Sequence, residues 1–152
     1  MAKYFIDTEF IEKPNTIQLI SIGIVCEDGR EYYNFSSEYN YKDSSQWVKD
    51  NVILPIWRQT FSGDARNFAP PVKNFHKHWG TPILKIKQQI LNFIGEDKEP
   101  EFWGYYADYD WVVFCWIFGK MIDLPKGWPM YCRDLKQLSD SMSPSIPKFA
   151  EQ

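Results

Sequence analysis

The sequence predicts an α/β protein built on one mixed sheet that is flanked by helices. Two observations predict this class: the first third of the chain is rich in strand-forming residues, and the second half alternates between helix-like and strand-like segments. Strands first, followed by alternating helices and strands, favour a sheet with both antiparallel and parallel neighbours. A length of 152 residues is typical of one domain, so we expect a single domain over residues 1–152.

The first 54 residues carry the signals of three strands and one short helix. The segment "AKYFID" is short and apolar, and "TIQLISIGIVCEDGREYYNF" contains two β-rich runs separated by "EDGR". Asp28 and Gly29 favour a hairpin turn there, because glycine tolerates positive φ. We therefore expect a three-stranded antiparallel meander. The segment "DSSQWVKDNVI" then predicts a short helix with Asp43 or Ser44 as its N-cap.

The middle of the chain divides into an irregular connection and a helix. Residues 55–80 contain several prolines and glycines among aromatic residues, which favours a long irregular connection with at most one short helical piece. The segment "TPILKIKQQILNFIG" predicts a helix, because its isoleucines recur on one face, Thr81 can cap it and Gly95 ends it.

Strand and helix signals alternate from Pro100 onwards. "PEFWGYY" predicts a strand, and "DYDWVVFCWIFG" predicts a short helix that is apolar on nearly every side and therefore buried. "PMYCRD" is the candidate for a final strand, and "DLKQLSDSM" begins another helix with Asp134 as its cap. The tail "SPSIPKFAEQ" predicts no further element.

The composition disfavours several classes of protein. Apolar residues make up 44% of the chain and aromatic residues 18%, which is enough for a core and disfavours disorder. No apolar run reaches the length of a membrane span, so we expect no membrane association. The chain has three cysteines, Cys26, Cys115 and Cys132. Their odd number and apolar surroundings favour reduced thiols and a cytoplasmic location over a disulfide framework.

Charge is distributed unevenly along the chain. The net charge is −3, but residues 55–90 hold six basic residues and one acidic residue, whereas the segments on either side are acidic. A basic middle between acidic ends can steer a polyanion toward an acidic, metal-loaded site. On charge alone, however, a solvated surface with scattered lysines explains the pattern better.

Asp7 and Glu9 interrupt the apolar run "YFIDTEFIE". Residues i and i+2 of a strand point to the same side, so both carboxylates share one face and Thr8 lies on the other. Two like charges repel, and a divalent cation such as Mg²⁺ or Mn²⁺ removes that penalty; a salt bridge to a lysine at a strand end is the alternative. A third acid, Asp110, starts the buried helix just after a strand, where ligands bind in open α/β sheets, and Asp108 competes with it as a helix cap.

Several of these segments resemble the DEDD superfamily of 3′–5′ exonucleases, and within it the RNase T-like bacterial 3′-exoribonucleases. The likeness rests on "YFIDTEF", "TIQLISIGIVCEDGREYYNF", "YDWVVFCWIFG" and "CRDLKQL". It implies an RNase H-like fold and a metal-dependent 3′–5′ exoribonuclease that trims the 3′ ends of single-stranded RNA. A DNA exonuclease and a non-catalytic nucleic-acid-binding domain are the alternatives. RNase T-like proteins often dimerise, so a homodimer is among the expectations.

The resemblance also implies roles for individual residues. The implied catalytic acids and metal ligands are Asp7, Glu9 and Asp110, which would hold two Mg²⁺ or Mn²⁺ ions. The implied substrate-binding residues are Phe10, which would pack against the terminal nucleotide, Thr8 and Tyr106.

The sequence departs from this family toward its C-terminal end. The family also has a histidine and, a few residues later, an aspartate on a last helix, and no such pair follows Ser141. His76 and His78 precede the second motif, so we interpret "HKH" as a loop feature rather than as a ligand pair. We expect the 152-residue chain to lack its C-terminal helix and to be nearly inactive until an extension restores the missing groups.

Overall fold

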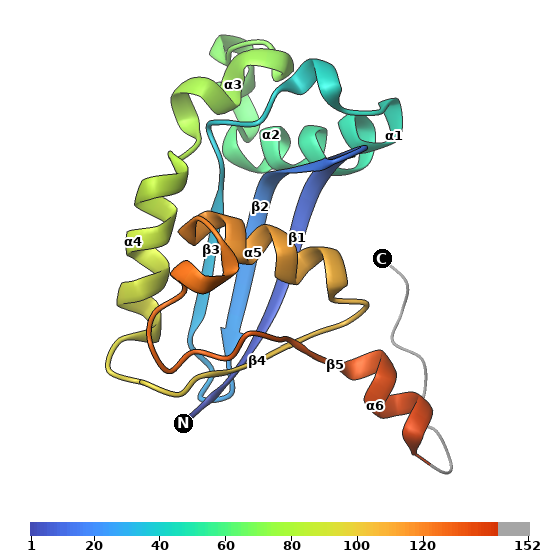
Figure 1. The fold of residues 1–152 in the computed structure, drawn as a ribbon. Helices are drawn as coiled ribbons and strands as arrows, with labels where there is room; N and C mark the ends of the chain where they lie inside the picture. Colours follow the sequence, from blue (N-terminus) through green and yellow to red (C-terminus); the bar gives the residue numbers. More distant parts are fainter. Residues whose placement is uncertain (143–152) are drawn as a thin grey trace.

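The computed structural model describes residues 1–142, which form a five-stranded mixed sheet with helices packed against it (Figure 1). The strand order is β3-β2-β1-β4-β5. β2 runs antiparallel to both of its neighbours, whereas β4 runs parallel to β1 and to β5. The predicted α/β class, with a mixed sheet flanked by helices, is therefore confirmed.

The elements occur in the order that the sequence predicts, with short helical pieces added between them. The strands are β1 (Lys3–Lys13), β2 (Thr16–Cys26), β3 (Glu31–Phe35), β4 (Glu101–Gly104) and β5 (Arg133–Asp134). The α-helices are α1 (Gln46–Val48), α2 (Leu54–Thr60), α3 (Val72–Trp79), α4 (Ile83–Ile94), α5 (Asp108–Phe118) and α6 (Leu135–Ser141). The shorter pieces are η1 (Tyr41–Asp43), the π-helical η2 (Lys49–Ile53), η3 (Gly63–Phe68) and η4 (Met121–Asp123).

The main core lies between the sheet and helices α4 and α5, which cover the same face (Figure 1). β1 contributes Tyr4 and Ile6 to this core, because alternate residues of a strand point to the same side. The isoleucine stripe predicted for α4 is buried in it through Ile86, Ile90 and Ile94. This packing fixes β1 at the centre of the sheet.

A β-bulge divides the apolar residues of β2 between two cores. The register shifts between Glu9 and Phe10, which leaves Ile20 of β2 without a partner in β1. Ile22 and Leu19, on either side of it, both face the core under α4 and α5, whereas Ile20 joins a smaller apolar cluster beneath α2 and α3. The smaller cluster therefore closes one end of the sheet.

Residues 55–80 are more regular than predicted. They form α2, η3 and α3, so the interpretation of this segment as a long irregular connection, and of "HKH" as part of a loop, was wrong. Pro71 is the N-cap of α3 and its carbonyl accepts the N–H groups of Asn74 and Phe75, so the proline begins the helix instead of interrupting it. Phe75 and His76 are the buried residues of this helix.

Two helix caps also differ from the prediction. Ser45, and not residue 43 or 44, caps α1 by accepting the N–H of Val48 at 3.2 Å. The Thr81 hydroxyl donates to Asn34, and the first N–H of α4 is accepted by the carboxylate of Glu38. A partner far away in the sequence therefore replaces the local cap.

The thiols and the helix lengths agree with the composition. Cys26, Cys115 and Cys132 are all free cysteines. No helix in the described part of the chain is long and apolar enough to cross a membrane.

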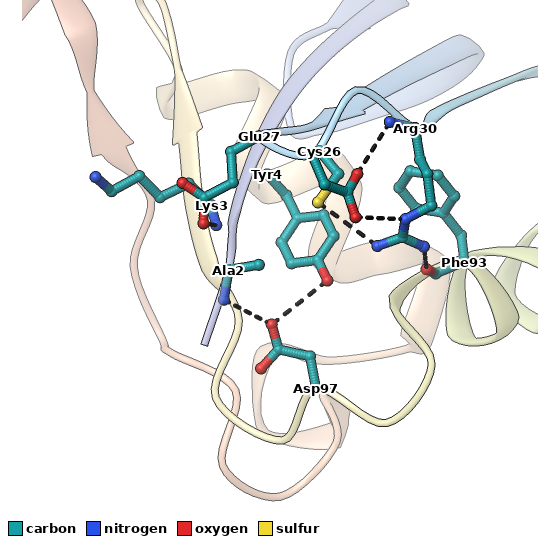
Figure 2. A network of polar contacts seen from close by, with 9 residues as sticks. Ala2, Lys3, Tyr4, Cys26, Glu27, Arg30, Phe93 and Asp97 are labelled. Carbon is teal, nitrogen blue, oxygen red and sulfur yellow. Dashed lines mark hydrogen bonds and ion pairs between the residues drawn. The ribbon is translucent and has the colours of Figure 1, made fainter.

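Asp97 fixes the beginning of β1 (Figure 2). Its Oδ2 atom accepts the backbone N–H of Ala2 at 2.8 Å and the hydroxyl of Tyr4 at 3.4 Å. The N-terminal ammonium lies 3.3 Å from Oδ1. Burial alone would raise the pKa of Asp97, but hydrogen bonds from the amides of Ala2 and Glu99, together with the bond and charge of the N-terminal ammonium, lower it below its ordinary value. The ionised form of Asp97 is therefore more favourable in the folded chain than in the unfolded chain.

We expect Asp97→Ala to lower the free energy of unfolding by about 1–3 kcal/mol at neutral pH, because it leaves buried donors without an acceptor. The folded pKa of Asp97 lies below the unfolded one, so the contribution of the ionised group is complete above the unfolded pKa and is lost as the pH falls through the folded pKa. Urea unfolding at a series of pH values should show the difference from the parent shrinking in acid. Asp64→Ala, at an exposed acid, is the control, and a difference that is the same at every pH would contradict this account.

Candidate active site

β1 loses its parallel neighbour early in its length. β4 pairs only with residues 3–5 of β1 and then turns away through residues 105–107 into α5. Gly104 permits this turn, because a Cβ atom at that position would lie 2.6 Å from the Cβ of Ala107. The part of β1 that follows therefore has one edge without a strand beside it.

Asp7 and Glu9 project from this part of β1 into a cleft of about 440 Å³. Both are exposed, and Thr8 between them is buried on the opposite face, as the alternation of a strand requires. Gly23 pairs with Asp7 on one side and with Tyr33 on the other. A Cβ atom on Gly23 would meet nothing within 4 Å, so the missing side chain leaves open space in the row from Asp7 to Tyr33. The other lining residues are Ser21, Asn51, Val52, Pro55, Ile56 and Gln59.

Asp110 reaches β1 from the first turn of α5. Its Oδ1 atom accepts the backbone N–H of Thr8 at 3.0 Å and also accepts the Thr8 hydroxyl. In the part of the chain that the structure describes, no strand neighbours this edge of β1, so Asp110 supplies the acceptor that a ladder would otherwise provide. Asp110 is buried, with 7% of its surface exposed. The third predicted acid is therefore bonded directly to the residue between the other two.

The pKa values of all three carboxylates are raised, chiefly by burial. The cleft walls remove water from Glu9 and raise its pKa to about 6, and the charges of Asp7 and Asp110 add to this shift. Burial also raises the pKa of Asp7 and of Asp110, although hydrogen bonds from Thr8 act in the opposite direction on both. Among residues 1–142, none of the three forms an ion pair, so the salt bridge considered for Asp7 or Glu9 is not found.

Two aromatic residues that adjoin the candidate acids in sequence, Phe10 after Glu9 and Tyr109 before Asp110, are in contact. Phe10 is half-buried and contacts the ring of Tyr109 edge-on, with 6.0 Å between the ring centroids. Tyr106, the other aromatic residue predicted to bind substrate, is exposed in the turn before α5 and has a φ of 52°. Tyr109 was not among the residues predicted from the sequence, although its place directly before the candidate acid Asp110 is a signal that could have identified it.

Asp134 holds the turn that leads into α5. Its Oδ2 atom accepts the N–H of Ala107 at 2.9 Å, and its Oδ1 atom accepts the N–H of Tyr106 at 3.3 Å. Oδ1 also accepts the N–H of Lys136 at 2.7 Å, so Asp134 caps α6 as predicted. One carboxylate therefore joins the end of the last strand to the turn that positions Asp110.

Asp108 and the two histidines take no part in the cleft. Asp108 is exposed, and no side chain caps the start of α5, so the cap considered for Asp108 was wrong. His76 is buried in α3 and His78 is exposed on the same helix, and neither lines the cleft that contains Asp7 and Glu9.

The donor atoms at the cleft fit a hard divalent cation. Carboxylate oxygens are preferred ligands of Mg²⁺ and Mn²⁺, and a positive charge would relieve the repulsion among Asp7, Glu9 and Asp110. Within residues 1–142, however, no three His, Cys, Asp or Glu side chains stand close enough together to form a ready-made metal site. Asp7 and Glu9 are the residues best placed to hold an ion, because both face the cleft.

The chain is similar to proteins described as exoribonucleases. Residues 2–145 match the model of a family described as the 3′–5′ exoribonuclease Rv2179c-like domain. Two Mycobacterium tuberculosis proteins are each 36% identical to the chain over 146 residues: 3′–5′ exoribonuclease Rv2179c of strain ATCC 25618 / H37Rv and 3′–5′ exoribonuclease MT2234.1 of strain CDC 1551 / Oshkosh. Each match covers 95% of this chain and 79% of the relative.

We expect Asp7→Asn to leave the melting temperature in EDTA unchanged or to raise it by up to about 4 °C, because it removes a carboxylate charge that no basic residue among residues 1–142 balances. Asp64→Asn removes an exposed charge remote from the cleft and serves as the control. Differential scanning calorimetry is the measurement. A melting temperature several degrees below that of the parent would mean that the Asp7 carboxylate is a structural partner.

We expect Asp134→Ala to loosen the start of α5 selectively, because the amides of Tyr106, Ala107 and Lys136 lose their acceptor. Hydrogen exchange followed by mass spectrometry should show faster exchange, by about tenfold or more, in peptides covering residues 104–112, with β1 and β2 unchanged. Asp134→Asn keeps one acceptor oxygen and should lie between the parent and the alanine variant.

Asp140→Ala is the control for that experiment, because the one side-chain partner of Asp140 within residues 1–142 is Lys136, on the exposed side of α6. Equal acceleration of exchange in all peptides of Asp134→Ala would contradict the local role of Asp134.

Proposed function

Because the chain belongs to the family of Rv2179c-like 3′–5′ exoribonuclease domains, we propose that it is a hydrolase that removes nucleotides from the 3′ ends of single-stranded RNA. The observation that carries this proposal is the placement of Asp7 and Glu9 in one cleft, with Asp110 bonded to Thr8 between them. Carboxylates with raised pKa values that face a cleft, and that no basic residue of the described chain neutralises, are typical of catalytic sites.

Asp7 and Glu9 would hold the cations of a metal-dependent reaction, with Asp110 as the third ligand. When bound, two Mg²⁺ or Mn²⁺ ions would lower the pKa of an attacking water and stabilise the charge on the leaving 3′-oxygen. The contribution of the chain is rigid placement. The strand period aims Asp7 and Glu9 into one cleft, and the Thr8 hydrogen bonds hold Asp110 against the same strand.

Phe10 and Tyr109 would receive the terminal base of the RNA. Stacking on aromatic rings is worth about 1–3 kcal/mol per base and depends little on sequence, which suits an enzyme that removes successive nucleotides. Tyr106 offers a further exposed ring in the adjacent turn. Thr8 is buried, and both its N–H and its hydroxyl are bonded to Asp110, so we assign it to positioning that acid rather than to direct contact with RNA.

We further propose that the fold is RNase H-like and that the site is of the DEDD type. The antiparallel strands β3, β2 and β1, followed by the parallel β4 and β5, support the first assignment. Two acids on the central strand and one at the start of the following buried helix support the second. A cytoplasmic location is part of the same proposal, and the three free thiols support it.

The test is stepwise trimming of a 5′-labelled single-stranded oligoribonucleotide in Mg²⁺ or Mn²⁺, resolved on a denaturing gel. We expect EDTA to abolish trimming and Asp110→Asn to slow it by at least about 10²-fold, since even the loss of an outer-shell partner of a metal ligand costs about 10–100-fold. Asp108→Asn, two residues away on the exposed side of α5, is the matched control and should retain the activity of the parent.

The alternatives give different gels. Trimming that survives Asp110→Asn would remove that residue from the site. Binding of RNA without trimming, both by the 152-residue chain and by a C-terminally extended form, would favour a non-catalytic domain. Equal trimming of an oligodeoxyribonucleotide would favour a DNA exonuclease, because the 2′-hydroxyl distinguishes the two substrates. The same gel, run with the 152-residue chain and with a C-terminally extended form that carries a histidine and an aspartate, tests the expectation that the 152-residue chain alone is nearly inactive.

A further inference from the structure

A second hollow, of about 510 Å³, lies between residues 37–42 and helix α3. Three of the side chains that line it are lysines. Lys73 and Lys77 are one turn apart on α3 and therefore lie on the same side of the helix, and Lys42 lines the hollow from the other segment. Two of these lysines belong to the basic middle of the chain, none of whose basic residues lines the carboxylate cleft.

The positive charge of this hollow is not neutralised within the part of the chain that the structure describes. Lys42, Lys73 and Lys77 are exposed, and none of them forms an ion pair among residues 1–142. Glu38 is the acid that lines the hollow, and its carboxylate accepts the first N–H of α4. The positive end of that helix therefore offsets the charge of Glu38.

The two walls of the hollow are held together by His76. Its Nε2 atom lies 2.7 Å from the carbonyl oxygen of Tyr39, and since a carbonyl only accepts, Nε2 is the donor. The two rings stack with centroids 3.9 Å apart, and both residues are buried. Burial lowers the pKa of His76, and the charge of Lys77 acts in the same direction against the effect of the hydrogen bond, so the ring is neutral. The segment that carries Lys42 and the helix that carries Lys73 and Lys77 are therefore held together without any ligand.

Tyr33 connects this hollow with the carboxylate cleft. Tyr33 in β3 lines the cleft, and β3 ends at Phe35, two residues before the segment 37–42 that lines the hollow. Helix α2 also lines the cleft through Ile56, which packs in the same apolar cluster as Tyr39. Tyr39 in turn lines the hollow. An RNA strand whose 3′ end lies beside Glu9 can therefore continue past Tyr33 toward the lysines of the hollow.

We propose that the hollow lined by Lys42, Lys73 and Lys77 binds backbone phosphates of the RNA strand upstream of its 3′ end. This inference rests on the proposed function and extends it to the nucleotides that precede the one being removed. Lysine ammonium groups act as point charges and recognise phosphate without reading the base. Lys73 and Lys77 also belong to the segment 55–90, which is basic whereas its neighbours are acidic, and excess positive charge attracts a polyanion. The site would favour long substrates over short ones irrespective of sequence.

The test measures binding without catalysis. Fluorescence anisotropy in EDTA follows a labelled oligoribonucleotide of about 16 nucleotides over a range of salt concentrations. For the double variant Lys73→Gln/Lys77→Gln, we expect the plot of log association constant against log salt concentration to be less steep by about 1.4. Each lost contact to single-stranded RNA contributes about 0.7 to the steepness of this plot. If parent and variant bind equally at 1 M salt, this difference makes the variant bind roughly 25-fold more weakly than the parent at 0.1 M salt. The matched control is Lys85→Gln/Lys98→Gln, which removes the same charge from exposed positions outside the hollow.

Trimming kinetics provide the second readout. In the hollow variant, KM for the long oligonucleotide should rise with kcat unchanged, while both constants for an oligonucleotide of about 4 nucleotides should match those of the parent. Salt slopes that fall equally in the hollow and control variants would overturn the inference, as would equal competition by polyglutamate of similar charge, which would identify an acidic protein as the ligand. Lysine-dependent RNA binding in a protein that trims no RNA would instead leave the hollow in place and refute the proposed activity.

Discussion

The hydrogen bonds that Thr8 donates to Asp110 join the central strand to α5, and the candidate site exists only because of them. The period of β1 is enough to place Asp7 and Glu9 on one face, but it brings no third acid near them. That acid arrives from a helix whose start is held in turn by Asp134. Hydrogen bonds from backbone amides to a carboxylate are stronger than neutral ones, so the helix start and the strand behave as one rigid unit.

The acids of this chain divide into two groups by what their oxygens contact. Asp97 and Asp134 accept several backbone amides each and hold segments in place, as structural carboxylates do. Asp7 and Glu9 face a cleft, and no basic residue of the described chain neutralises them. Asp110 belongs to both groups, because it is bonded to Thr8 and also repels its neighbours. This division separates acids that stabilise the fold from acids whose repulsion costs stability and whose position in a cleft suits ligand binding.

Local patterns were sufficient where the deciding partner is close in sequence. The alternation of β1, the isoleucine stripe of α4 and the Asp134 cap could all be predicted from a few neighbouring residues. Prediction failed where a distant residue decides the outcome. Glu38 takes the cap expected of Thr81, and the amides before α5 are satisfied by Asp134 so that Asp108 has no cap to make. The hollow between residues 37–42 and α3 was equally hidden, because prolines were interpreted as signs of irregular chain and not as a helix start.

Gly23 has a consequence for how such a protein diverges. Its backbone is ordinary strand, and added atoms would meet no neighbour, so selection for folding alone has no reason to keep a glycine there. The space it leaves lies in the same row as Asp7 and Tyr33, inside the cleft. Lineages that retain only the scaffold would be free to fill this position, and lineages that still admit a ligand would not. The identity of this one residue would therefore record, across descendants of the gene, whether the cleft remained in use.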